Sequence, residues 1–169
     1  DADTEIEKTI AAKLQNDVET IFASYEKILN TNGETKNLYA MEELEEAMQK
    51  VMDEYAGGIS TNYQFNEKQL ALAEEKIEKL TVLANEVTAE NMHELLFAYE
   101  LKERLIVCKS LIAHLKARKE TRWHSFNENL DYPDTDENYY KYVNSKLENG
   151  EIKIIFRDIV KGAEYEHQN

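Results

Sequence analysis

Residues 89–119, AENMHELLFAYELKERLIVCKSLIAHLKARK, carry the longest apolar helical pattern of the chain and decide its fold. Their aliphatic and aromatic side chains fall on more than one face of an α-helix. A helix that is apolar over most of its circumference is normally buried by several neighbours. The pattern therefore predicts a central helix with the other helices packed around it.

Three further segments repeat apolar residues at steps of mostly three or four, the spacing of an amphipathic helix. The stripes are Ile6, Ile10, Leu14, Ile21, Tyr25 and Ile28 in the first segment, Met41, Leu44, Met48, Val51 and Tyr55 in the second, and Leu70, Ala73, Ile77, Leu80, Ala84 and Val87 in the third. Asn30-Thr31-Asn32-Gly33 and Gly57-Gly58 are expected to end the first two helices, because glycine and asparagine adopt the left-handed conformation. Asn66 and Gln69 have the spacing of a capping box at the start of the third.

The expected fold class is all-α: an antiparallel helical bundle of three to four long helices with a short irregular C-terminal extension. Within this one domain, we expect an N-terminal helix at residues 1–37 and the bundle core at residues 38–122. The extension would occupy residues 123–169.

The extension has a different pattern from the bundle. Tyr139, Tyr140 and Tyr142 lie in residues 136–147, for which we expect a short aromatic helix. Residues 151–160, EIKIIFRDIV, are expected to form a short extended segment.

The composition limits the class of protein. The 169 residues are 42% hydrophobic and 32% charged, with one proline, which is typical of a folded, helix-rich domain. A net charge of −14 argues against nucleic-acid binding and against binding to anionic membranes. No apolar stretch approaches the roughly 20 residues that span a bilayer, so we expect no membrane insertion. The single cysteine, Cys108, gives no disulfide framework, and we expect a cytoplasmic protein.

Two Glu-x-x-His pairs, Glu90 with His93 and Glu164 with His167, have the spacing with which helical bundles present di-iron ligands. Such a site needs two further glutamates from other helices, and glutamate is abundant enough here for chance matches. No Gly-rich phosphate loop or nucleophile motif is present either. The residues alone therefore indicate no catalytic, cofactor-binding or metal-binding side chain.

A series of short motifs, in a fixed order, points to a family. The motifs are Asp53-Glu54-Tyr55-Ala56-Gly57-Gly58, Tyr63 with Asn66-Glu67, His93-Glu94-Leu95-Leu96, Tyr99-Glu100, Arg104, Glu120-Thr121-Arg122-Trp123, Asp131-Tyr132-Pro133 and Val143-Asn144-Ser145. Over residues 41–160 they resemble the C-terminal helical domain of adenylylsulfate reductase flavoprotein (alpha) subunits. Those subunits belong to the fumarate reductase/succinate dehydrogenase flavoprotein superfamily, to which L-aspartate oxidase is also similar. Residues 124–129, HSFNEN, depart from the Pro-Gly and aromatic run that usually follows this tryptophan, which keeps a fumarate reductase-like paralogue open.

The resemblance implies that the chain is part of an FAD-dependent oxidoreductase subunit and that the FAD is held elsewhere. In the family, flavin and substrate are bound by domains that precede the matched region, so no residue of this chain inherits those roles. The resemblance also implies packing on the N-terminal flavin domain and a surface towards an iron–sulfur subunit. We expect the chain alone to be catalytically inactive. A free-standing acidic helical interaction module is the alternative.

Residues 118–133, RKETRWHSFNENLDYP, concentrate the unusual side chains, including the only tryptophan and the only proline. The resemblance suggests that they form a domain-docking patch, because interfaces are enriched in Trp, Arg and Tyr. The candidate docking residues are Glu120, Arg122, Trp123, Asp131, Tyr132 and Pro133. Alternatively, Glu120 and Arg122 only cap the bundle and Trp123 covers its end.

Overall fold

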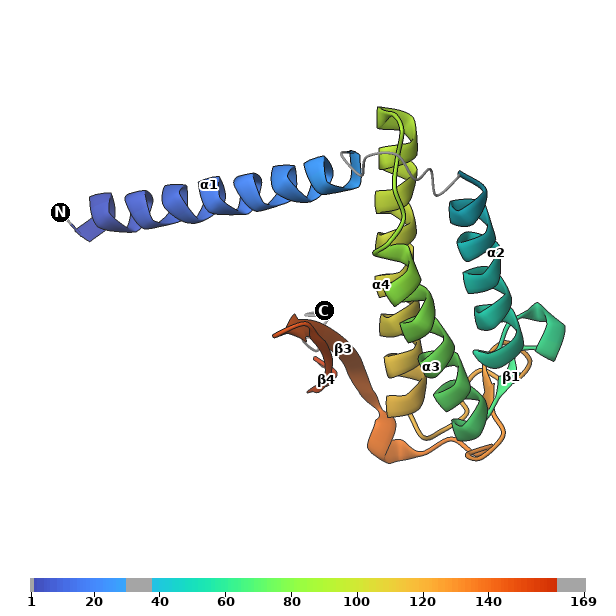
Figure 1. The fold of residues 1–169 in the computed structure, drawn as a ribbon. Helices are drawn as coiled ribbons and strands as arrows, with labels where there is room; N and C mark the ends of the chain where they lie inside the picture. The colour runs from blue at the N-terminus through green and yellow to red at the C-terminus, as the bar shows by residue number, and fades with distance from the viewer. Residues whose placement is uncertain (1, 30–37, 161–169) are drawn as a thin grey trace, which may run out of the picture.

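The computed structural model describes residues 2–29 and 38–160, and it is built mainly from four helices (Figure 1). The helices are α1 (Ala2–Leu29), α2 (Leu38–Tyr55), α3 (Glu67–Ala84) and α4 (Met92–Ala117). Two short strands, β1 (Gln64–Phe65) and β2 (Glu128–Asn129), pair in parallel, and β3 (Lys141–Glu148) and β4 (Glu151–Asp158) form an antiparallel hairpin. The 3-10 turns η1 (Ile59–Thr61) and η2 (Glu137–Tyr139) complete the elements. The predicted all-α class is confirmed in its broad sense, with a few small strands added.

Helix α3 runs antiparallel to both α2 and α4, and the three helices enclose the main core (Figure 1). The stripes predicted for the second and third segments point into this core. The largest fully buried apolar side chains are Met41, Leu70, Ile77, Leu101, Leu105 and Ile112. Burial of a Leu or Ile side chain contributes about 1.5–3 kcal/mol, so this group contributes substantially to the stability of the bundle.

The predicted helix ends are partly confirmed. Gly57 has φ +77°, so the left-handed conformation follows α2 as expected. At α3, the N–H of Gln69 donates to Asn66 Oδ1 at 2.8 Å, which is half of the predicted capping box. The other half is absent, because Gln69 Oε1 is buried without a partner. The expected end of the first helix at residues 30–33 lies outside the described residues.

Helix α1 contradicts the prediction that the other helices pack around α4. It extends away from α2, α3 and α4 (Figure 1), and its side chains at residues 4–23 are all exposed. Ile6, Ile10 and Leu14 thus point into solvent. Helices α2 and α3 cover the buried face of α4 by themselves, and α1 extends away from the face that stays open.

The C-terminal extension is more regular than predicted. Residues 141–148 form a strand and not the expected aromatic helix, and residues 151–158 confirm the expected extended segment. The two strands are joined by Asn149-Gly150, both with positive φ (55° and 82°), which is the backbone of a two-residue type I′ hairpin turn. Pairing across this turn outweighs the local helical spacing of the tyrosines.

Candidate docking surface at the end of helix α4

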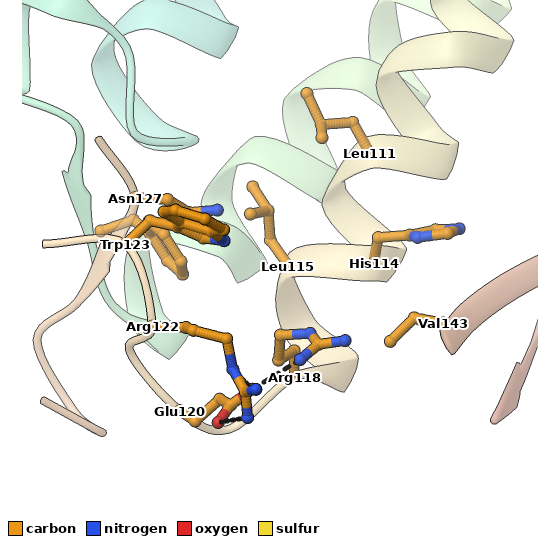
Figure 2. Close-up of a pocket in the computed structure, with 10 residues that line it drawn as sticks. Leu111, His114, Leu115, Arg118, Glu120, Arg122, Trp123, Asn127 and Val143 are labelled. Atoms are coloured by element: carbon orange, nitrogen blue, oxygen red, sulfur yellow. Dashed lines mark hydrogen bonds and ion pairs between the residues drawn. The ribbon is translucent and has the colours of Figure 1, made fainter. Parts of the chain in front are cut away.

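An ion triad closes the C-terminal end of α4. The side chain of Glu120 is fully buried and accepts from two arginines, with 2.5 Å between Arg118 Nη1 and Glu120 Oε1 and 2.9 Å between Arg122 Nη2 and Glu120 Oε2 (Figure 2). The backbone N–H of Asp136 donates a further bond to Glu120 Oε2 at 3.0 Å. Arg122 Nε also donates to Glu120 Oε1 at 3.1 Å, so each oxygen of this carboxylate has two donors, as burial of its charge requires.

The arginines use their remaining donors on backbone carbonyls. Arg118 donates to the carbonyls of Tyr139 and Lys141, at 3.0 and 2.9 Å, and thereby fixes the start of β3 against α4. The guanidinium of Arg122 also lies over the ring of Tyr140, 5.4 Å from its centroid. Burial raises the pKa of Glu120, but the bonds from Arg122, Asp136 and Arg118 outweigh it and hold the pKa below its usual value.

Thr121, next to the triad, holds the loop after α4 together through hydrogen bonds with three other residues of that loop. Its hydroxyl donates to the carbonyl of Tyr132 at 2.9 Å and accepts from the backbone N–H of Asn129 at 2.9 Å. Its backbone N–H donates to the carbonyl of Asp134 at 3.0 Å. Thr121 is fully buried, so these bonds are shielded from water and hold the loop in one conformation.

Asp131 and Tyr132 fasten the same loop to the start of α3. Asp131 Oδ2 accepts from the backbone N–H of Glu67 at 2.7 Å, and the hydroxyl of Tyr132 lies 3.1 Å from Glu67 Oε1. Lys119 completes the contact, with its Nζ 3.0 Å from Glu67 Oε1. The pKa of Glu67 is lowered by its hydrogen bond with Lys119 and by that with Tyr132.

Trp123 does not cover the end of the bundle. It stands 69% exposed on the loop, and Phe126 beside it is 74% exposed. Trp123 and Asn127 form one side of a hollow of about 180 Å³ whose other sides include Leu111, Leu115 and Val143 (Figure 2). An adjoining hollow of about 390 Å³ shares Arg118, Arg122, Trp123 and Asn127 and is bounded by η2 and β3.

The exposed apolar residues of α4 continue from the first hollow. Leu111 lines the hollow, Val107 lies one turn before it at 65% exposure, and Leu96 lies three turns further back, also exposed. These three residues, with Ile106 and Met92 at their margin, form what we call the outward stripe of α4. The stripe lies opposite the side that α2 and α3 cover, and the β3–β4 hairpin contacts another part of α4. The prediction that neighbours bury α4 on several sides therefore fails for the outward stripe.

The candidate docking residues therefore fall into two groups. Glu120, Arg122, Asp131 and Tyr132 make the contacts within the chain described above, whereas Trp123 and Pro133 are exposed. Whether this patch docks another domain remains a prediction. The sequence reasoning missed the outward stripe, whose signal was a helix with apolar residues on more faces than two neighbours can cover.

The described residues give no sign of a redox or metal centre of their own. Within residues 2–29 and 38–160, no three His, Cys, Asp or Glu side chains gather closely enough to hold a metal ion. Glu164 and His167 lie outside this part of the chain. Cys108 is half-buried, and burial raises the pKa of its thiol, which keeps it protonated. None of the described helices is long and apolar enough to cross a membrane.

Comparison with known proteins gives consistent matches. The family model described as the fumarate reductase flavoprotein C-terminus matches residues 45–166. The adenylylsulfate reductase subunit alpha of Megalodesulfovibrio gigas is 31% identical over 100 residues, which are 59% of this chain and 15% of that protein. This chain thus spans less than a sixth of that relative.

Two solved structures share the fold. Adenylylsulfate reductase from the hyperthermophilic Archaeoglobus fulgidus matches with a TM-score of 0.68 and 35% identity, over 72% of this chain and 19% of that one. An adenosine-5-phosphosulfate reductase in complex with sulfite matches with a TM-score of 0.69 and 28% identity, over 91% of this chain and 25% of that one. Residues 30–169 alone are too few to make up 91% of the chain, so the second match includes part of α1.

Proposed function

Because the chain belongs to the fumarate reductase flavoprotein C-terminal family, we propose that it is the helical domain of an FAD-dependent oxidoreductase subunit of the adenylylsulfate reductase type. Its task in that subunit is to pack on the flavin domain and to support assembly with an iron–sulfur subunit. The observation that carries the proposal is the outward stripe of α4, which continues into the exposed Trp123 and Phe126.

The exposure of these side chains favours a protein partner. Isolated exposed apolar residues are ordinary, but Val107 and Leu111 lie one turn apart on the open face of α4, and Leu111 lines a hollow with the exposed Trp123. Apolar residues gathered beside an aromatic side chain in this way are typical of an interaction surface. Trp123 has two properties of an interface anchor, because it is large and is held on a loop that Thr121 fixes. The matched relatives are several times longer than this chain, so the partner surface can belong to the same polypeptide.

The described residues do not fit a flavin. A dinucleotide needs a Gly-rich turn between a strand and a helix, and the sequence has none. The arginines beside the two hollows are committed to Glu120 and to backbone carbonyls. We therefore assign the two-electron chemistry, with adenylylsulfate/sulfite or fumarate/succinate as substrate, to the remainder of the subunit, and we expect this chain alone to be inactive and free of FAD.

The test exchanges an outward apolar side chain for a charge. Leu111→Asp and Val107→Asp in the full-length subunit should weaken the attachment of this domain, measured as its release from the flavin domain after a protease cut between the two. Val82→Asp is the matched control, because Val82 is also exposed but lies on α3. The same three variants of the isolated chain should keep its melting temperature within a few degrees. Equal attachment of all three variants would overturn the proposal.

A second observation separates this proposal from a free-standing interaction module. If the reading frame of the gene continues upstream into a Gly-rich flavin-binding motif, the chain is part of a flavoprotein subunit. A frame that encodes no such motif would support the interaction module.

A further inference from the structure

The hairpin of β3 and β4 has two open edges, and its turn determines which backbone groups face outward. In a two-residue hairpin the residues that flank the turn, Glu148 and Glu151, are a hydrogen-bonded pair. Hydrogen-bonded and non-hydrogen-bonded pairs then alternate along the ladder. Leu147, Ser145 and Val143 belong to non-hydrogen-bonded pairs, so their backbone N–H and C=O groups point away from β4.

Two observations support this assignment. The carbonyl of Lys141, the next residue in the same alternation, accepts from Arg118 Nη2 at 2.9 Å and so points outward. The backbone groups of Val143, Ser145 and Leu147 have no partner among the described residues outside the hairpin ladder. The edge of β3 therefore presents three residues of unpaired backbone, which is the surface that an added strand uses.

The edge of β3 borders the candidate docking surface. Val143 lines the smaller hollow together with Trp123, and Lys141 and Tyr142 line the larger one. Ser145 Oγ lies 3.2 Å from Ser110 Oγ, and Ser110 directly precedes Leu111 and follows Val107 by about one turn of α4. An extended segment laid along β3 would thus place its inner side chains over the outward stripe and one of them in the hollow.

The edge of β3 and the two hollows beside it form what we call the furrow, and the charges around it indicate which kind of segment would fit. Arg118, Arg122 and Lys141 line the two hollows together with one acidic residue, Glu120. Both arginines bind Glu120, but one carboxylate does not balance three cations, so the furrow keeps a net positive charge in a chain of net charge −14. Two polar side chains in the furrow, His114 and Asn127, have no side-chain hydrogen bond within the described part of the chain. The chemistry suits a segment in which apolar residues alternate with acidic or other hydrogen-bond-accepting residues.

We propose that an extended segment of the flavin domain, with alternating apolar and acidic residues, adds to the edge of β3 as a third strand. This inference rests on the proposed function and deepens it by naming the mode of docking. The edge of β4 is the less suitable one, because the hollow at its start is lined by three glutamates, Glu74, Glu78 and Glu151, and by one lysine, Lys109. That hollow is therefore net negative and less favourable for an acidic segment.

Hydrogen exchange at single amides tests the proposal with a control inside the same hairpin. In the isolated chain, the outward amides of Val143, Ser145 and Leu147 should exchange fast. In the full-length subunit they should exchange more slowly by about tenfold or more. The outward amides of Ile152, Ile154 and Phe156 on β4 should stay fast in both. Protection of the β4 amides instead, or of neither set, would overturn the inference.

A proline scan gives an independent readout. Ser145→Pro removes an outward N–H without removing a ladder bond, so it should weaken attachment of the domain to the flavin domain by about tenfold. Ser145→Ala controls for the lost Ser110 contact and should attach normally. Ile154→Pro, at the cross-strand partner of Ser145, should also attach normally. Melting of each isolated variant checks that the hairpin remains folded.

The outcomes separate the two proposals. If Leu111→Asp weakens attachment while Ser145→Pro does not, the helical surface docks without strand addition, and only this inference fails. If neither variant changes attachment, the proposed function fails with it.

Discussion

The two sides of helix α4 differ in what covers them. On one side, Leu101, Leu105 and Ile112 are fully buried against α2 and α3. On the other, Leu96, Val107 and Leu111 are just as apolar but are exposed. The same helix therefore belongs to a core that the described chain completes and to a surface that it leaves open. The difference shows why periodicity alone cannot tell a helix that is buried on all sides from a helix with one open side.

The largest predicted effect compares the same substitution on the two sides. Leu105→Ala should lower the free energy of unfolding by about 2–5 kcal/mol, because it leaves a cavity between α3 and α4. Leu96→Ala should change it by less than about 0.5 kcal/mol, since Leu96 is exposed. Urea denaturation of the isolated chain measures both. Similar losses would mean that the outward side is covered in this chain.

The next effect concerns the triad that closes the buried side. Glu120→Gln removes the charge that two half-buried arginines share, and we expect a loss of about 2–3 kcal/mol, below the range for fully buried pairs. Glu103→Gln on the exposed part of α4 is the control and should be near neutral. A loss below about 0.5 kcal/mol for Glu120→Gln would show that the loop is held mainly by Thr121.

The pH dependence should be smaller and has a definite sign. The pKa of Glu120 in the folded chain is below its unfolded value of about 4.5, so its contribution is complete above that pH. The contribution is lost as the pH falls through the lower, folded pKa. Urea midpoints between pH 7 and pH 3 should therefore converge for the wild-type chain and Glu120→Gln. A constant difference across this range would contradict the assignment.

The smallest effect is expected for α1. Its side chains at residues 4–23 are exposed, so removal of residues 1–29 should change the free energy of unfolding of the bundle by less than about 0.5 kcal/mol. Thermal melting of the full and the shortened chain, followed by the near-ultraviolet circular dichroism of the packed core, compares the two stabilities. A marked loss would show that α1 covers part of the open side in solution.

The parts of the fold that depend on local signals could be predicted from the sequence. The apolar stripes placed α2 and α3 correctly, and glycine and asparagine marked the end of α2 and the start of α3. The strand at residues 141–148 was missed, although Asn149-Gly150 is a strong hairpin signal. The spacing of the tyrosines alone favours a helix, and the cross-strand pairing of β3 with β4 overrides it.

The candidate site was predictable only as a region. The unusual composition of residues 118–133 located it, and the structure describes how Glu120 and Arg122 bind each other there. No sequence pattern could show that Arg118 donates hydrogen bonds to the carbonyls of Tyr139 and Lys141. Those bonds form only when the loop after α4 folds back towards the end of the helix. The exposure of Trp123 is equally a property of the folded loop.

The short parallel pair of β1 and β2 has a consequence for the order of folding. It joins Phe65 to Leu130 through a 2.8 Å backbone bond and Gln64 to Glu128 across 64 residues of sequence. Contacts of such separation carry a large loop-closure cost and form after local ones. The antiparallel pair of α3 and α4 should therefore assemble first, and the β1–β2 contact should then fasten the loop with Trp123 in place. Completion of the candidate docking surface would be a late step, reached only by chains whose bundle is already formed.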